Sequence, residues 1–461
     1  MVKYHLIVLV HGIWGNSSHL GYIEKQLEHE SGKNREEDEL IVVYKTGSHA
    51  GYMTYDGIDV NGKRISDEIW DVTNELNQDG NVVSKFSIVG YSLGGLISRY
   101  AIGVLFSQSY FRTIEPVNFV TFCTPHVGIL NPCHGFSVSM FNKVVPHLLA
   151  HTGNQLFLKK SANLVDKEKR LPLLVWMTDP KSYFFKGLAG FRRRTLYANV
   201  INDKRTSFFT SYISKIDPFN SYSNNDPSIL DLSYIKNYEP TVIDISKSVG
   251  IRQFPVDKKI KRHSKVSLLT RVLYWSKVVF NLILFTPLWS LWFIGISVLE
   301  RIKLNRRVGA FSKNSSSDLI HLYKFDEEAE DSRNLKRSLS FLSLSNNELL
   351  FENLEREISN QVNEQTDTLV ESVFDAINSR QVDQSEGSPV QNGELLSKLH
   401  LNEFQLYIIN QLNSLTWEKY PIIIRNTKAT HACAIVRFKD PHFDEGKVVV
   451  AHFVKEVFQY H

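Results

Sequence analysis

A serine in the pentapeptide Gly-Tyr-Ser-Leu-Gly, residues 90–94, is the clearest candidate for chemistry in this chain. The pentapeptide lies between an apolar run at residues 86–89 and a helical pattern that begins at Leu93. Small residues on both sides let a strained serine point out of a strand-to-helix turn, as a nucleophile elbow requires. The pattern therefore predicts that Ser92 is a nucleophile, and the alternative is an ordinary serine in a turn.

A serine hydroxyl is a weak nucleophile at neutral pH, so it needs a general base, usually histidine, and a carboxylate that fixes the tautomer of that histidine. His431 follows the last strand pattern of the chain, and Asp203 closes a clear strand pattern. The chain order Ser92, Asp203, His431 is the order of nucleophile, acid and base in α/β-hydrolases. Asp179 and Asp217 are alternative acids, and a structural role is the alternative for His431.

Two backbone N–H groups are candidates for the oxyanion hole that acyl transfer needs. One belongs to Leu93, the residue after the nucleophile, at the start of the predicted helix. The other belongs to Ile13, in the segment His-Gly-Ile-Trp-Gly at residues 11–15, which follows the first strand pattern. Its glycines let the backbone approach a ligand closely. The sequence therefore predicts an oxyanion hole formed by Ile13 and Leu93.

Four further residues are expected to line the substrate site. His11, Gly12 and Trp14 share the oxyanion loop, and His11 is expected to shape this loop rather than to act as a base. His126 follows another strand end, in the segment Thr-Pro-His-Val-Gly at residues 124–128. Because it follows a strand end, as the other candidates do, His126 is expected near the same site.

Strand and helix patterns alternate up to about residue 130, which predicts an α/β fold with a mainly parallel sheet and helices on both faces. Apolar residues at helical spacing cover residues 65–76 and 96–105. Short β-branched or aromatic runs predict strands at residues 6–10, 40–44, 82–89, 117–122, 195–200 and 420–424. The candidate residues then lie at or just beyond strand ends.

The chain divides into four predicted parts. Residues 1–250 form the first part of an α/β-hydrolase core, with a candidate cap at 130–190, and residues 401–461 complete the core. Residues 251–325 hold a hydrophobic segment with basic flanks, and residues 326–400 are polar and partly disordered. Exposed-looking aromatic residues in the candidate cap and just after it are Tyr183, Phe184, Phe185 and Phe191.

The hydrophobic segment, residues 278–299, carries no charge over 22 residues, and about 20 suffice to cross a bilayer core. Pro287 near its middle favours a hairpin that leaves the membrane on the side it entered. Basic residues on both flanks suit two ends on one anionic, cytosolic face. A hairpin also keeps Ser92 and His431 on one side, whereas a single span would separate them. The single span and a buried core helix are the alternatives.

Composition narrows the classes of partner and cofactor. A net charge of +4 with mixed signs gives no case for a nucleic-acid partner. Three cysteines argue against a disulfide framework and favour a reducing compartment. The apolar run at residues 6–10 is too short for a signal segment, so the catalytic part is expected to face the cytosol. No HExxH, EF-hand or Cys/His zinc spacing occurs in the sequence, so we expect no metal and no cofactor.

These motifs resemble a fungal and plant family of serine esterases that includes the lipid-droplet phospholipase of budding yeast. The resemblance rests on residues 11–15, 90–95 and 124–128 and on His431 with Ala432. It covers residues 1–130 well and is patchier further along the chain. It implies an α/β-hydrolase fold, hydrolysis of acyl esters in glycerophospholipids and attachment to lipid droplets. It also implies that Ser92 is the nucleophile, His431 the base and Asp203 the acid.

The predicted function is a serine-dependent lipid acyl-ester hydrolase, a phospholipase at the surface of lipid droplets or of the endoplasmic reticulum. The predicted partners are an acyl-glycerol substrate and a lipid surface. The nearest alternative is a neutral-lipid lipase with the same three residues, acting on tri- or monoacylglycerol. A further alternative is a membrane-bound binding protein on an inactive hydrolase scaffold, which the full set of candidate catalytic residues disfavours.

Overall fold

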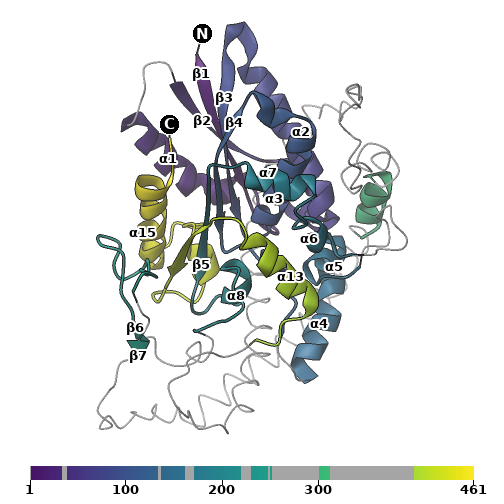
Figure 1. The fold of residues 1–461 in the computed structure, drawn as a ribbon, viewed down its shortest axis with the longest axis vertical. Helices are drawn as coiled ribbons and strands as arrows, with labels where there is room; N and C mark the ends of the chain where they lie inside the picture. The colour runs from purple at the N-terminus through teal and green to yellow at the C-terminus, as the bar shows by residue number, and fades with distance from the viewer. Residues whose placement is uncertain are drawn as a thin grey trace, which may run out of the picture.

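A six-stranded parallel sheet is the centre of the computed structural model (Figure 1). The structure describes residues 2–33, 39–132, 136–160, 171–219, 230–247, 250–251, 301–311 and 399–460. The strands are β1 (Lys3–Val10), β2 (Glu39–Lys45), β3 (Val82–Tyr91), β4 (Glu115–Phe122), β5 (Arg193–Asn199) and β8 (Glu418–Ile422), in the order β2-β1-β3-β4-β5-β8. Every predicted strand is observed, with ends shifted by three residues or fewer. The predicted parallel sheet is therefore confirmed.

The central strand β1 shows why these strands read as unbroken apolar runs. Side chains alternate between the two faces of a strand, so a sheet covered on both faces must bury every residue. Leu6, Val8 and Val10 belong to one hydrophobic core, and Ile7 and Leu9 belong to the other. All five side chains are fully buried. The sequence of β1 thus fits only a strand with helices on both sides.

Helices cover both faces of the sheet (Figure 1). One face carries α2 (Ile58–Leu76), α3 (Leu93–Ser107), α7 (Tyr183–Ala189) and α13 (Glu403–Leu412), and the other carries α1 (Gly21–Lys33) and α15 (Asp444–His452). The other helices are α4 (Phe136–Leu148), α5 (Ala150–Leu156), α6 (Leu173–Trp176), α8 (Phe208–Ser211) and α14 (Thr430–Cys433), with 3₁₀ turns that include η2 (Gly51–Asp56). A small antiparallel pair joins β6 (Leu230–Asp231) to β7 (Gly250–Ile251). This arrangement is that of an α/β-hydrolase core.

The C-terminal part of the chain completes the same sheet. Strand β8 pairs in parallel with β5, from Thr195 opposite Glu418 onward, although β5 and β8 lie far apart in the sequence. The last residues also bind the first strand, because His5 Nδ1 donates to the carbonyl of Tyr460 at 2.9 Å. The segment between β5 and β8 is therefore an insertion within one folded unit, whose sheet contains both strands.

Three of the four aromatics expected to be exposed are inside the protein, so the expectation is wrong for them, while Tyr183 is half-buried. Phe184, Phe185 and Phe191 are only 1%, 8% and 2% exposed. The reason is that α7 packs against α3, where two glycines allow close approach. A Cβ on Gly103 would lie 2.2 Å from Phe184 Cδ1, and one on Gly187 would lie 2.9 Å from the carbonyl oxygen of Ile102.

Two predicted features fall outside the described residues, namely the apolar segment 278–299 and the polar part 326–400 apart from its last two residues. Both stay predictions. Within the ranges described above, no helix combines the length and the hydrophobicity that crossing a membrane requires.

We expect Gly103→Ala to destabilise the fold, because the added methyl group would meet both Cδ1 and the backbone Cα of Phe184. Overpacking of this kind costs about 1–3 kcal/mol of unfolding free energy. Chemical denaturation measures this loss. Gly32→Ala in α1, where a Cβ meets nothing within 4 Å, is the matched control and should be neutral or stabilising. Equal stability of the two variants would contradict the close packing of α3 and α7.

Candidate active site

Ser92 occupies the turn between β3 and α3 in a backbone conformation that L-residues rarely adopt. Its φ is 55° and its ψ is −126°, outside the favoured regions. The Ser92 N–H donates to the carbonyl oxygen of Phe122 at the end of β4, at 2.8 Å. The residue is 8% exposed, so its hydroxyl lies near the surface but is largely enclosed. This is the geometry of the expected elbow.

The glycines around Ser92 are required by close backbone contacts. A Cβ on Gly90 would lie 2.4 Å from the Cα of Gly95. A Cβ on Gly94 would lie 2.2 Å from the carbonyl oxygen of Val10 at the end of β1. A Cβ on Gly12 would lie 2.8 Å from the Cβ of Ser92 itself. The glycines of both motifs thus allow β1, β3 and α3 to meet at the serine.

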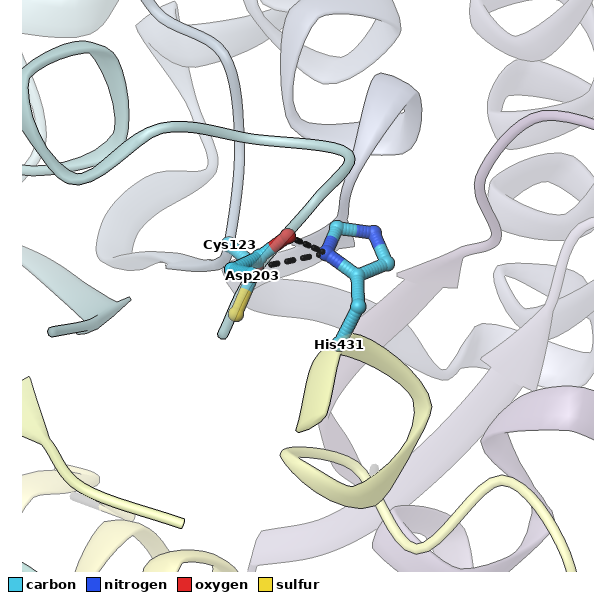
Figure 2. A group of neighbouring side chains, drawn as sticks. All are labelled: Cys123, Asp203 and His431. Carbon is cyan, nitrogen blue, oxygen red and sulfur yellow. Dashed lines mark hydrogen bonds and ion pairs between the residues drawn. The ribbon is translucent and has the colours of Figure 1, made fainter. Parts of the chain in front are cut away.

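His431 connects Ser92 to Asp203 by hydrogen bonds. Its Nε2 lies 2.9 Å from Ser92 Oγ, and its Nδ1 lies 2.9 Å and 3.1 Å from the two oxygens of Asp203. His431 is on α14, just beyond β8, and Asp203 is in the loop after β5. Figure 2 shows the paired contacts between Asp203 and His431. The side chains of His431 and Asp203 are 6% and 2% exposed. The three residues predicted from chain order therefore meet in one hydrogen-bonded row.

The carboxylate of Asp203 is surrounded by donors. The N–H groups of Arg205 and Thr206 donate to Oδ1 at 3.1 Å and 2.9 Å, and Asn199 Nδ2 donates to Oδ2 at 3.2 Å. Burial alone would raise the pKa of Asp203, but the charge of His431 and these hydrogen bonds hold it below its ordinary value. Asp203 therefore stays ionised at neutral pH. Asp179, one of the alternative acids, instead bonds to the Lys181 N–H and the Tyr407 hydroxyl.

Cys123 is a neighbour of this row that the sequence analysis did not select. It follows β4 with a positive φ of 48°, and its Sγ lies 3.4 Å from Asn199 Nδ2. Sγ also lies within 4.8 Å of ligand atoms of Asp203 and His431 (Figure 2). The signal available in the sequence was its place directly after a strand, because the carboxyl ends of parallel strands share one edge of the sheet.

Cys123, Asp203 and His431 are also close enough together to be considered as metal ligands. A metal would need a thiolate and a free imidazole nitrogen. Burial, and then the charge of Asp203, raise the pKa of Cys123 well above its ordinary value, so its thiol stays protonated. His431 Nδ1 is already bonded to both oxygens of Asp203. These properties fit a support for the histidine better than a metal site.

The predicted oxyanion loop is a tight turn beside Ser92. The Gly15 N–H donates to the Gly12 carbonyl at 3.0 Å, and Trp14 has a φ of 54° at the third position, as a type II turn requires. Among the described residues, no hydrogen-bond acceptor is found for the N–H groups of Ile13 and Leu93. Since Gly12 touches Ser92, both donors are available near the serine.

Two buried histidines, His11 and His49, hydrogen-bond to the backbone of this loop. The rings of His11 and His49 stack with their centroids 3.7 Å apart and nearly parallel, at 7°. His11 Nδ1 donates to the Gly12 carbonyl at 3.0 Å, and His49 Nε2 donates to the His11 carbonyl at 3.2 Å. Burial lowers the pKa of His49 to about 4 and lowers that of His11 well below its ordinary value. Both rings are therefore neutral at pH 7.

The four residues predicted to line the substrate site differ in their burial and in their contacts. His11 and His126 have no exposed surface, and His126 Nε2 bonds to Thr121 Oγ1 at 3.0 Å. Trp14 is half-buried, and its indole N–H donates to the Tyr55 hydroxyl on η2. Gly12 lies against Ser92. Their contact with substrate stays a prediction. The side chain of His11 bonds within the loop beside the serine, and that of His126 bonds to β4.

Comparisons with known proteins find similarity to serine esterases and lipases. Residues 2–216 match the model of a family described as "Putative serine esterase (DUF676)". "Putative lipase C4A8.10" of Schizosaccharomyces pombe is 33% identical over 213 residues, which cover 45% of this chain and 26% of that protein. "Putative lipase ROG1" of Saccharomyces cerevisiae is 29% identical over 276 residues, which cover 59% and 36%. The chain thus matches about a quarter to a third of the length of these relatives.

One solved structure similar to this chain is an "Extracellular alpha/beta-hydrolase from Paenibacillus species". It is 16% identical, and the superposition covers 31% of this chain and 52% of that chain with a TM-score of 0.21.

We expect the stability of the fold to fall as the pH drops from 6.5 towards 4, in part through His49. The pKa of His49 is about 4 in the folded protein against an ordinary value of 6.5, so the unfolded chain binds more protons in this window. The contribution of His49 to the unfolding free energy is complete above pH 6.5 and declines as the pH falls below that value. His49→Gln keeps an N–H donor at this position. In this variant the slope of the unfolding free energy against pH should be smaller by about 1.4 kcal/mol per pH unit.

Denaturation at several pH values measures this slope. A slope that does not change in His49→Gln would show that His49 is not held neutral inside the fold.

Proposed function

We propose that the protein is a serine-dependent hydrolase of lipid acyl esters, since residues 2–216 match the model of this serine esterase family. The observation that carries the proposal is the unbroken row of hydrogen bonds from the strained Ser92 through His431 to Asp203, with 2.9 Å on each side of the imidazole. A nucleophile, a base and an orienting carboxylate in this relation are what acyl transfer by serine requires.

In the proposed mechanism Ser92 Oγ attacks the ester carbonyl while His431 Nε2 takes its proton. The ionised Asp203 accepts a hydrogen bond from Nδ1, which fixes the tautomer that leaves Nε2 free and stabilises the imidazolium that forms. The N–H groups of Ile13 and Leu93 would bind the oxyanion of the tetrahedral intermediate. His431 then gives its proton to the leaving alcohol, and the acyl group stays on Ser92.

Water completes the reaction. His431 acts again as a base and removes a proton from the water that attacks the acyl-enzyme, and Ser92 is regenerated when the acid leaves. The catalytic residues of the proposal are therefore Ser92, Asp203 and His431. Asn199 and the Cys123 thiol act as positioning residues, because they touch the carboxylate side of this row and not the substrate.

We propose a glycerophospholipid as the substrate, cleaved at the surface of lipid droplets or of the endoplasmic reticulum. The support is the sequence resemblance described above and the basic residues that flank residues 278–299, which suit an anionic lipid surface. The names of the two yeast relatives favour lipid esters in general, since both are described as lipases. A neutral-lipid lipase would use the same three residues.

A substrate panel tests this function. We expect the full chain to hydrolyse phospholipid in mixed micelles faster than triacylglycerol, and Ser92→Ala to lose hydrolysis of both by about 10⁴-fold or more. Release of fatty acid is the measurement. Ser107→Ala is the matched control, because this hydroxyl lies at the far end of α3 and donates only to the Val104 carbonyl. Retained hydrolysis in Ser92→Ala would overturn the mechanism, and a preference for triacylglycerol would overturn the choice of substrate.

A further inference from the structure

Helix α4 exposes an apolar ridge that a water-facing helix would not carry. Met140, Val144 and Leu148 are 46%, 44% and 67% exposed and recur every four residues, so they lie along one face. Elsewhere on α4, Val138 and Phe141 are buried in the protein. The α4 ridge, defined as Met140, Val144 and Leu148, is therefore a second apolar face that the described fold does not cover.

A basic helical segment, residues 301–311, lies at one end of this ridge. The Arg301 guanidinium donates to the carbonyl of His147 at 3.0 Å, which fixes the segment to the last turn of α4. Ile302 is 45% exposed and extends the apolar surface, whereas Leu304 is buried. The exposed cations on this surface are Lys143, Arg301, Lys303 and Arg306. Figure 1 shows this segment on the same side of the molecule as α4 and α5.

The same segment is tied to the proposed oxyanion loop. Arg307 pairs with the buried Asp56 through two hydrogen bonds of 2.8 Å and 2.9 Å. Asp56 is the last residue of η2, whose Thr54 accepts a hydrogen bond from the N–H of Trp14 at 3.1 Å. Hydrogen bonds therefore link the apolar ridge, the basic segment and the loop beside Ser92.

We propose that the α4 ridge and the cations beside it are the surface with which the protein contacts a phospholipid membrane that contains anionic lipids. Exposed apolar side chains next to lysines and arginines match the boundary between acyl chains and anionic headgroups. The chain supplies a second argument, because the charge-free residues 278–299 end just before Arg301. The inference rests on the proposed function in one respect, since this membrane contact would bring Ser92 to a lipid substrate.

A fluorescent label on the ridge tests this contact in the full chain. Leu148→Cys, in a Cys133→Ser background because Cys123 and Cys433 are buried, is labelled with an environment-sensitive dye. We expect its emission to shift to the blue on vesicles of phosphatidylcholine with phosphatidylserine, and less on phosphatidylcholine alone. The control label is at Ile245→Cys, which is 54% exposed next to the bridge from Val242 to β8 and should not shift.

Binding of variants to the same vesicles measures the contribution of the ridge. Met140→Ser, Val144→Ser and Leu148→Ser together should weaken binding by about tenfold or more. A matched triple variant replaces the exposed apolar residues Ile216, Ile245 and Leu406 by serine and should bind as the wild type does.

Three results would overturn the proposal. The first is a label at residue 148 whose emission does not shift on vesicles. The second is an equal loss of vesicle binding in both triple variants. The third is an emission shift that grows with protein concentration in the absence of vesicles, which would mean that a second copy covers the ridge. Hydrolysis of a soluble short-chain ester separates this failure from failure of the proposed function. Hydrolysis with an unshifted label contradicts only the membrane contact, and a shifted label without hydrolysis contradicts only the enzyme.

Discussion

The strained backbone of Ser92 is the constraint on which the rest of the site depends. A residue in such a conformation costs of order 1–3 kcal/mol and persists only where its surroundings hold it. Here the Phe122 carbonyl accepts the Ser92 N–H, and the Gly95 N–H donates to the Ser92 carbonyl at 3.1 Å. Gly94 sits against the end of β1, and Gly12 sits against Ser92 itself. Three neighbouring strands thus fix the serine, and any larger residue at these glycines would push it away from His431.

Much of the sheet and of the central row could be predicted from the sequence because both depend on local patterns. Strands buried on both faces give continuous apolar runs, and the ends of parallel strands converge, so Ser92, Asp203 and His431 could be selected from chain order and strand ends. Cys123 satisfies the same strand-end rule, but nothing in its local sequence distinguishes a support for Asp203 from an ordinary buried thiol. The stacking of His11 on His49 joins two loops far apart in the chain, and no spacing rule indicates it.

The aromatics near α7 illustrate the limit of local reasoning in the opposite direction. A run of phenylalanines in an irregular stretch suggests an exposed surface, yet Phe184 is buried because Gly103 and Gly187 let two helices approach. Contacts between distant parts of the chain also constrain the insertion after β5. Residues 230–247 and residues 301–311 attach to one body, through the bridge from Val242 to β8 and the Arg307–Asp56 pair. The hairpin at residues 278–299 lies outside the described residues and stays a prediction.

Identification of the residue that a fluorophosphonate modifies tests the central claim most directly. The probe needs a serine whose proton is taken by a neighbouring base, and it reports this without any assumption about the lipid substrate. Peptide mass spectrometry of the labelled full chain should give one adduct, on the peptide that contains Ser92, and this adduct should form much more slowly when His431 is replaced by alanine. An adduct on another residue, or no adduct on a folded chain, would contradict the account.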